Sequence, residues 1–408
     1  MKPVEKTNRI QSIDLLRGIA ILGILIMNIQ SFAMPSAAYN NPLAYGDLTG
    51  LNKITWILSH LFADQKFMSI FSILFGAGII LITEKKELLT GSSLKLHYTR
   101  NLILLLIGLL HAHLIWYGDI LVAYALCSFL VYPFRKLSPK KLLITGLLIL
   151  SVPSMLNGLF QFSLPFMPVS ELQDLSMDWA PSSELIEQEI IAFTGSLSHQ
   201  ITRNSQNALF LETIVFMILF LWRAGGLMLV GMALYKLGIL SAVHSRSFYL
   251  KNAFYSLTIG FPIVIYGMYM NFTMNWDFQY SMFAGSQFNY WGSLFIAYGY
   301  ISLIMVFAGS ENYYTIKKRL ASIGQMALTN YILHSFIGAF IFFGIGFGLF
   351  GKIDRSLQLI IVSAIWVFQY LVSEKWLNYY KFGPLEWVWR SLTSVSYTHL
   401  RAHETSNH

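Results

Sequence analysis

The residues best suited to chemistry in this sequence are a few ionisable side chains set in long apolar stretches. His111 and His113 flank Ala112, and Asp119 follows shortly after them. Residues two apart on a helix point about 200° apart, so the two histidines cannot face one site, and a two-histidine metal site is not expected. One histidine beside a carboxylate is a general-base arrangement. We predict His111 and Asp119 as catalytic residues; the alternative is a histidine hydrogen-bonded to a neighbouring helix.

A third catalytic candidate is Arg223, which lies in an apolar stretch with no acid next to it in the sequence. An arginine deep in a membrane needs a partner or a water-filled cavity. In a site that excludes water, such a cation stabilises developing negative charge. A purely structural role for Arg223 stays open.

Asp14 and Arg17 are three residues apart, so they share a helix face at the start of the first apolar stretch. A local ion pair would explain them. The alternative is a basic site in which Asp14 holds Arg17 for an anionic ligand, because arginine binds phosphate in a bidentate manner.

Four further polar residues are predicted to bind substrate. Asp64 and Lys66 precede the second apolar stretch, and Asn330 and His334 share a face because they are four residues apart. Interfacial charges and hydrogen bonds across helices are the alternatives. The small residues in FMSIFSILFGAGI, including Gly76 and Gly78, favour close helix packing.

The elements that position these residues are transmembrane helices. Charged residues make up only 12% of the 408 residues and apolar residues 55%, which excludes a disordered chain and a cytosolic enzyme. The single cysteine, Cys127, excludes internal disulfides and a cysteine-based zinc site. We therefore predict no metal. We also predict no nucleic-acid partner, because the net charge of +8 suits basic cytoplasmic loops.

A bilayer core needs about 20 apolar residues per helix. The sequence predicts an all-α, polytopic membrane protein with about ten spans, both termini in the cytoplasm, and a first span that is kept as an anchor. The sixth and ninth spans are long enough to tilt or break. The predicted spans are 15–33, 67–83, 101–117, 119–134, 142–161, 208–235, 252–272, 288–309, 324–350 and 356–373.

Positive charge sets this orientation. Only Lys53, Arg203, Lys352 and Arg355 of the 28 basic residues fall in the outer segments, as the positive-inside rule requires. The chain divides into an N-terminal membrane half (1–162), an acidic outer loop with an amphipathic helix (163–207), and a C-terminal membrane half (208–393). This outer helix, suggested by Leu185, Ile191 and their apolar neighbours, is interpreted as a lid or as part of a solvated loop. Residues 394–408 resemble the translated read-through of a sequencing adapter and are interpreted as a non-native tail.

A family resemblance covers residues 8–393. The segments RIQSIDLLRGIAILGILIMNIQSFAMP, FADQKFMSIFSILFGAG, GLLHAHLIWYGDILVAYAL, GQMALTNYILHS and FGPLEWVWRSLT resemble the YeiB-like bacterial inner-membrane proteins. These proteins carry a C-terminal domain of unknown function, numbered 418. The resemblance implies a multi-pass protein of the bacterial inner (plasma) membrane, and that family has been loosely linked to transport.

The start of the chain also resembles the wider transmembrane acyltransferase group, through Ser12, Asp14, Arg17 and Gly18. That group includes the acyltransferase-3 type and the lysosomal enzyme that acetylates heparan glucosamine. Its members use acyl-CoA and an intramembrane histidine to acylate a sugar on the other side of the membrane. This resemblance implies that acyl-CoA is the co-substrate and that His111 is the histidine.

On that hypothesis, acyl-CoA binds at the cytoplasmic edge near Arg9, Asp14, Arg17 and Arg100. The acceptor is a sugar, a lipid or a small metabolite, and the lipid bilayer is the other partner. Two alternatives stay open: a transporter of a small anionic or amphipathic solute, with Arg223 as the coupling charge, and a non-catalytic scaffold or sensor. The sequence does not indicate an oligomeric state.

Overall fold

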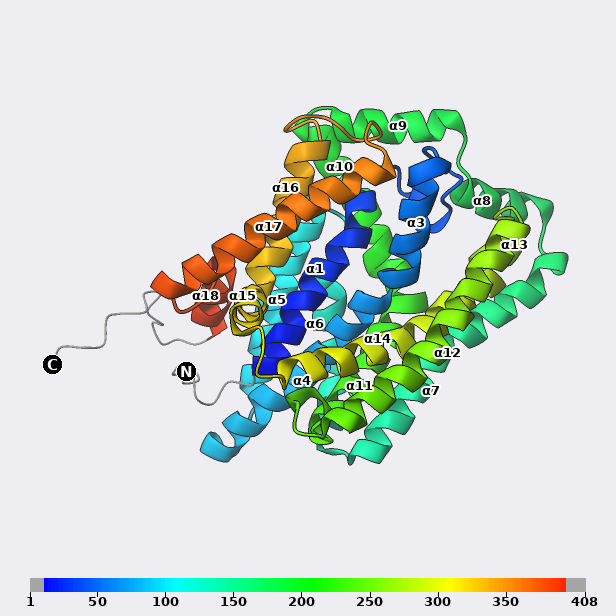
Figure 1. Cartoon of the computed structure of the whole chain (residues 1–408). Coiled ribbons are helices and arrows are strands. Elements are labelled where there is room, and N and C mark those ends of the chain that lie inside the picture. The colour runs from blue at the N-terminus through cyan, green and yellow to red at the C-terminus, as the bar shows by residue number, and fades with distance from the viewer. Residues whose placement is uncertain (1–10, 394–408) are drawn as a thin grey trace.

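The computed structural model describes residues 11–393, and these fold as a bundle of helices (Figure 1). Arg9 and the tail 394–408 lie outside the described residues. The first part of the bundle comprises α1 (Gln11–Ala33), α2 (Ala37–Asn40), α3 (Gly50–Phe62), α4 (Lys66–Thr90), α5 (Leu94–Leu114), α6 (Leu121–Val131) and α7 (Pro139–Ser163).

Three helices follow where the sequence predicts an outer loop with one helix. They are α8 (Val169–Trp179), α9 (Ser183–Thr194) and α10 (Leu197–Phe210). The sequence predicted only one helix in this segment, because these helices are short and polar and no long apolar run marks them. α9 lies across one end of the bundle (Figure 1).

The second part of the bundle starts without a break. α10 continues through a π-helical stretch, η4 (Leu211–Phe220), into α11 (Leu221–Lys236). The remaining elements are η5 (Ile239–Ser241), α12 (Arg246–Thr273), α13 (Phe278–Tyr280), η6 (Ser281–Gly285), α14 (Ser286–Ala308), α15 (Tyr314–Gln325), α16 (Ala327–Phe342), α17 (Arg355–Tyr379) and α18 (Pro384–Thr393).

The protein is a multi-pass helical membrane protein. Within residues 11–393, seven helices are long and apolar enough to cross a membrane, and the pair α15 and α16 gives an eighth if it counts as one span. That pair is bent by 78° where α15 meets α16, at the start of the predicted span 324–350, and α16 ends at Phe342, short of the predicted end. Neither α5 nor α6 is among the eight, and α6 has only 11 residues.

Glycines bring the central helices together. α1 lies in the middle of the bundle and packs against α4, α14, α15, α16 and α17 (Figure 1). A Cβ atom added to Gly18 would lie 1.9 Å from the carbonyl oxygen of Leu320, and one on Gly324 would lie 1.9 Å from that of Asp14. Gly76 of α4 and Gly231 of α11 meet each other's helix backbone equally closely. Small residues at such crossings let two helix backbones approach.

α18 holds the break between α15 and α16 in place. Glu386 accepts hydrogen bonds from the backbone N–H groups of Leu328 (2.6 Å) and Thr329 (3.1 Å) and from the Thr329 hydroxyl (2.6 Å). The first N–H groups of a helix have no partner within that helix, so this carboxylate caps α16. Burial raises the pKa of Glu386, and the hydrogen bonds from α16 oppose that rise.

Candidate functional site

The predicted catalytic pair His111 and Asp119 is in direct contact. Nδ1 of His111, in the last turn of α5, lies 2.6 Å from Oδ2 of Asp119, and both side chains are 1% exposed. The other oxygen of Asp119 accepts a hydrogen bond from the N–H of Val122 at the start of α6 (2.9 Å). The carboxylate therefore both orients the imidazole and caps a helix.

His113 faces elsewhere, as its spacing predicts. Its Nε2 lies 3.3 Å from Oε2 of Glu212 at the start of η4. The two histidines thus have different carboxylate partners and do not form a pair. Within residues 11–393, no group of three or more His, Cys, Asp or Glu side chains is arranged to hold a metal ion.

Aromatic rings surround His111. The ring of Tyr331 of α16 lies 5.4 Å from the imidazole, centre to centre, and that of Trp116 lies 6.3 Å away. The Tyr331 hydroxyl accepts a hydrogen bond from the N–H of Ile120 (3.2 Å). From α10, Asn204 accepts from the N–H of Tyr117 and donates to the carbonyl of Ile115, which fixes the turn between α5 and α6.

Two polar atoms in this enclosure are buried without a hydrogen-bond partner in the part of the chain described. They are Nε2 of His111 and Nε1 of Trp116. If the hydrogen bond to Asp119 places the imidazole proton on Nδ1, then Nε2 carries a lone pair. A lone pair in a buried, aromatic enclosure can take a proton from a hydroxyl or an amine, or attack an acyl carbon.

Arg223 is fully buried in α11 and binds neutral oxygens. Its Nη2 donates to the hydroxyls of Ser69 (3.1 Å) and Ser293 (2.9 Å), and its Nη1 donates to the carbonyl of Tyr290 (3.1 Å). The guanidinium also lies 4.4 Å from the centre of the Tyr290 ring, and its Nε has no partner among the described residues. The sequence offered no acid beside Arg223, and the structure supplies hydroxyls instead.

Asp64 and Lys66 form a buried polar chain through Asn289 of α14. Asn289 donates from Nδ2 to Asp64 (2.7 Å) and accepts from Nζ of Lys66 (2.7 Å). Lys66 also donates to the carbonyl of His60, whose Nδ1 lies 3.0 Å from Asp64. The two residues are therefore interior groups, which argues against simple interfacial charges.

The Arg223 site and the Asp64–Asn289–Lys66 chain adjoin each other along α4 and α14. Ser69 follows Lys66 on α4, and Tyr290 follows Asn289 on α14. Together, Arg223 and Lys66 bring two cations and Asp64 brings one carboxylate. The cluster therefore carries a surplus positive charge when both cations are protonated, which suits an anion. No hydrogen bond or ion pair within residues 11–393 joins Arg223 directly to His111 or Asp119.

The described residues of the predicted basic site lie near the N-terminal ends of α1 and α5, whereas His111 lies at the C-terminal end of α5. Arg17 pairs with Asp14 (3.0 Å), and Arg100 stacks on the ring of Trp389 (3.6 Å). Arg17 and Arg390 both lie close enough to repel Arg100 electrostatically. Arginines from α1, α5 and α18 thus lie near one another, and arginine is well suited to bind phosphate.

Asn330 and His334 both reach α17. Nε2 of His334 lies 2.9 Å from Oε1 of Gln369, and Nε2 of Gln369 donates to the Asn330 carbonyl (3.0 Å). Asn330 also donates to Ser373 (3.2 Å). This arrangement is the bonding across helices that the sequence offered as the alternative to substrate binding.

Sequence reasoning missed several residues of these sites. Asn289 and Ser293 lie in a span that reads as apolar and aromatic, and Tyr331 and Trp389 look like ordinary packing residues. The asparagine could have been found, because a polar side chain inside a membrane span is expensive unless it is bonded. The tyrosine and tryptophan carried no such signal.

The outer helix α9 carries a buried acid, Glu189. Leu185 and Ile191, predicted to pack on the surface below, are 46% and 58% exposed, whereas Glu189 and Phe193 are buried. Glu189 accepts hydrogen bonds from the N–H and the hydroxyl of Ser36. Burial raises its pKa above the ordinary value of 4.5, and Arg203 and Ser36 oppose the rise.

The docking of α9 should therefore weaken as pH rises. A raised pKa means that the folded form favours the protonated acid, so this stability is complete below pH 4.5 and is lost as pH rises through the raised value. We expect the protection of the Ser36 amide against hydrogen exchange to fall about tenfold for each unit by which the pKa is raised. Glu189→Gln should remove this dependence, and Glu187→Gln, an exposed acid on the same helix, should keep it. An unchanged pH profile in Glu189→Gln would contradict the assignment.

Comparisons with known proteins show which family the chain belongs to. Residues 234–396 match the family model described as "Protein of unknown function (DUF418)". The chain is 31% identical over 385 residues to "Uncharacterized protein YeiB" of Escherichia coli (strain K12), covering 94% of this chain and 95% of that protein. It is 26% identical over 415 residues to "Uncharacterized protein YxaH" of Bacillus subtilis (strain 168), covering 97% of each.

No solved structure matches the chain. The relatives span nearly the whole sequence, so the likeness extends well beyond the C-terminal region that the family model covers. The chain belongs to the YeiB-like family of bacterial membrane proteins that carry the DUF418 domain.

Proposed function

We propose that this protein is a membrane-embedded acyltransferase that moves an acyl group from acyl-CoA to a hydroxyl or amine acceptor. The observation that carries the proposal is the buried His111–Asp119 pair, 2.6 Å apart, with Nε2 of the histidine unpartnered in the described chain. A buried polar atom without a hydrogen-bond partner destabilises a core that has only a packing role. It suits a site where a bound substrate supplies that hydrogen-bond partner.

The proposed reaction assigns a step to each residue of the pair. As the acceptor oxygen or nitrogen attacks the thioester carbonyl, its proton passes to Nε2 of His111. The C–S bond breaks, CoA leaves as a thiolate, and this thiolate takes the proton from Nε2 of His111, which returns the imidazole to its neutral form. Asp119 holds the imidazole and stabilises its protonated form.

The donor is proposed to bind where Arg17, Arg100 and Arg390 converge. His111 lies eleven residues beyond Arg100 on α5, or about 16 Å along the helix axis. A thioester at the end of a flexible arm suits such a separation, because the phosphates of acyl-CoA stay at the helix ends while the acyl group reaches inward. The acceptor, which we propose to be a sugar, a lipid or a small metabolite, would approach from the side of α9 and α10.

The direct test is turnover. The full chain in liposomes, supplied with acetyl-CoA and a membrane extract as the source of acceptor, should release free CoA thiol in proportion to the protein. Protein-free liposomes with the same extract provide the background rate. Release no faster than this background, from protein shown to be folded, would count against the enzyme.

A second candidate is a transporter of a small anion. The surplus positive charge around Arg223 and Lys66 and the broken helix pair α15–α16 favour it, since discontinuous helices recur at transport sites. A transporter would accumulate anion in liposomes without consuming acyl-CoA, and Arg223→Gln should abolish that uptake.

We further propose ten spans in the bacterial inner membrane, with both termini cytoplasmic. The bent pair α15–α16 and the helices α5 and α6 add three spans to the seven long apolar helices. The distribution of basic residues supports the orientation. The only cysteine, Cys127, is buried, so single introduced cysteines report on topology.

This topology predicts a labelling pattern in intact cells. Glu171→Cys and Lys352→Cys should react with a membrane-impermeant maleimide, because both residues are exposed on outer segments. Lys140→Cys and Glu311→Cys, also exposed, should react only after the membrane is permeabilised. The reverse pattern would overturn the orientation.

A further inference from the structure

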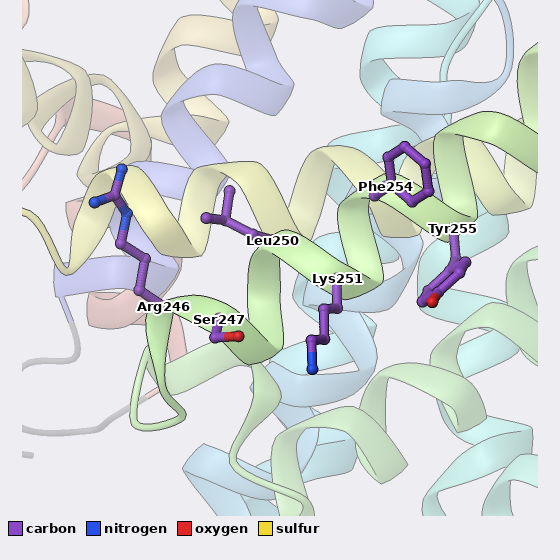
Figure 2. Close-up of a pocket in the computed structure, with 6 residues that line it drawn as sticks. All are labelled: Arg246, Ser247, Leu250, Lys251, Phe254 and Tyr255. Atoms are coloured by element: carbon purple, nitrogen blue, oxygen red, sulfur yellow. The ribbon is translucent and has the colours of Figure 1, made fainter.

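A shallow depression of about 530 Å³ runs along the outward face of α12 (Figure 2). Its lining residues form two adjacent rows, one through Arg246, Leu250 and Phe254 and the other through Ser247, Lys251 and Tyr255, and together these rows make one broad stripe with Arg246 and Lys251 at its two sides (Figure 2). Their side chains are all exposed. The lining residues are Arg246, Ser247, Leu250, Lys251, Phe254 and Tyr255.

The stripe has a charged end and an apolar end. Arg246 and Lys251 lie in the first two turns of α12, and Phe254 and Tyr255, which are 64% and 62% exposed, follow them. The sequence from Arg246 to Ile259 contains no acidic residue. Among the described residues, neither cation takes part in an ion pair or a hydrogen bond. The positive end of the helix dipole adds to their charge, because the helix begins at Arg246.

Much of α12 is turned away from the rest of the protein. α12 is a candidate span, and only 28% of its apolar window is buried inside the protein. Its opposite face packs on α14, where a Cβ atom on Gly260 would lie 2.9 Å from the carbonyl oxygen of Gly292. The depression therefore opens onto lipid, with its cations at one end of the span.

We propose that this stripe binds one anionic phospholipid. Its phosphate would lie between Arg246 and Lys251, within reach of the Ser247 hydroxyl, and its acyl chains would lie along Leu250, Phe254 and Tyr255. The order of charged and apolar groups along the stripe matches the order in a phospholipid that stands beside the helix. Anionic lipids gain more from two unpaired cations than zwitterionic lipids do, because in the latter the phosphate charge is balanced within the headgroup.

Native mass spectrometry of the full chain in detergent tests the proposal. With equal amounts of phosphatidylglycerol and phosphatidylcholine, we expect the protein to retain phosphatidylglycerol preferentially. The double variant Arg246→Gln/Lys251→Gln should bind it at least about tenfold more weakly, and Lys251→Gln alone about fivefold more weakly. Added inorganic phosphate should not displace it, because the acyl chains contribute to binding.

The matched control is Lys140→Gln/Lys141→Gln, which removes two exposed charges at the start of α7. It should bind phosphatidylglycerol as the wild type does, and all variants should keep the wild-type melting temperature. Equal retention of the two lipids, or equal loss in both double variants, would overturn the proposal. A dimer that Phe254→Ala dissociates, without any lipid preference, would assign the face to a second copy of the chain and would also overturn it.

Discussion

Replacing His111 with alanine should lower the release of CoA from acetyl-CoA by at least about 100-fold, because it removes the proposed proton acceptor. Asp119→Asn should lower it as well, since an amide holds the imidazole less well and cannot stabilise its positive charge. The measurement is the initial rate of thiol release in liposomes. Both variants should be compared at equal amounts of folded protein.

His113→Ala is the matched control for this prediction. His113 lies on the same helix, two residues away, and is paired with a different carboxylate, Glu212. We expect it to keep most of the wild-type rate. Turnover that survives His111→Ala, or that falls equally in His113→Ala, would show that the buried pair has a structural role. Asp119→Asn keeps the shape of the site, so it separates chemistry from packing if His111→Ala does not fold.

Gly76→Ala should prevent stable folding of the bundle. A Cβ atom at this position would lie 1.9 Å from the carbonyl oxygen of Met228, and backbone cannot move aside as a side chain can. Forcing even one methyl group into a packed core costs about 1–3 kcal/mol, and this clash with backbone should cost more. We expect a large fall in melting temperature or a loss of monodisperse protein in detergent.

Gly78→Ala isolates the packing effect, because it is two residues away on the same helix. A Cβ atom there meets nothing within 4 Å. Alanine favours helix over glycine by up to about 1 kcal/mol, so this variant should be at least as stable as the wild type. If Gly76→Ala and Gly78→Ala behaved alike, the close crossing of α4 and α11 would be wrong.

The sequence predicted the fold class because membrane helices are visible in composition alone. Long apolar runs locate α1, α4, α7, α11, α12, α14 and α17. The outer helices α8 to α10 were underestimated, because short polar helices gain their stability from docking contacts such as Glu189 with Ser36. Those contacts are far apart in sequence and leave no periodic signal.

The candidate site was predictable where one helix and its following turn supply the residues. His111 and Asp119 are eight residues apart, and their contact needs only the turn between α5 and α6. The surroundings of Arg223 were not predictable, because Ser69, Tyr290 and Ser293 come from two other helices. The same holds for Trp389, which reaches Arg100 from α18.

Calorimetry of the full chain with acetyl-CoA tests the central claim most directly. The proposal predicts saturable binding that weakens in Arg17→Gln and survives in His111→Ala, because the donor phosphates and the reacting histidine lie at different depths along α5. Absence of binding at millimolar acetyl-CoA, by protein shown to be folded, would contradict the acyltransferase and favour the anion transporter.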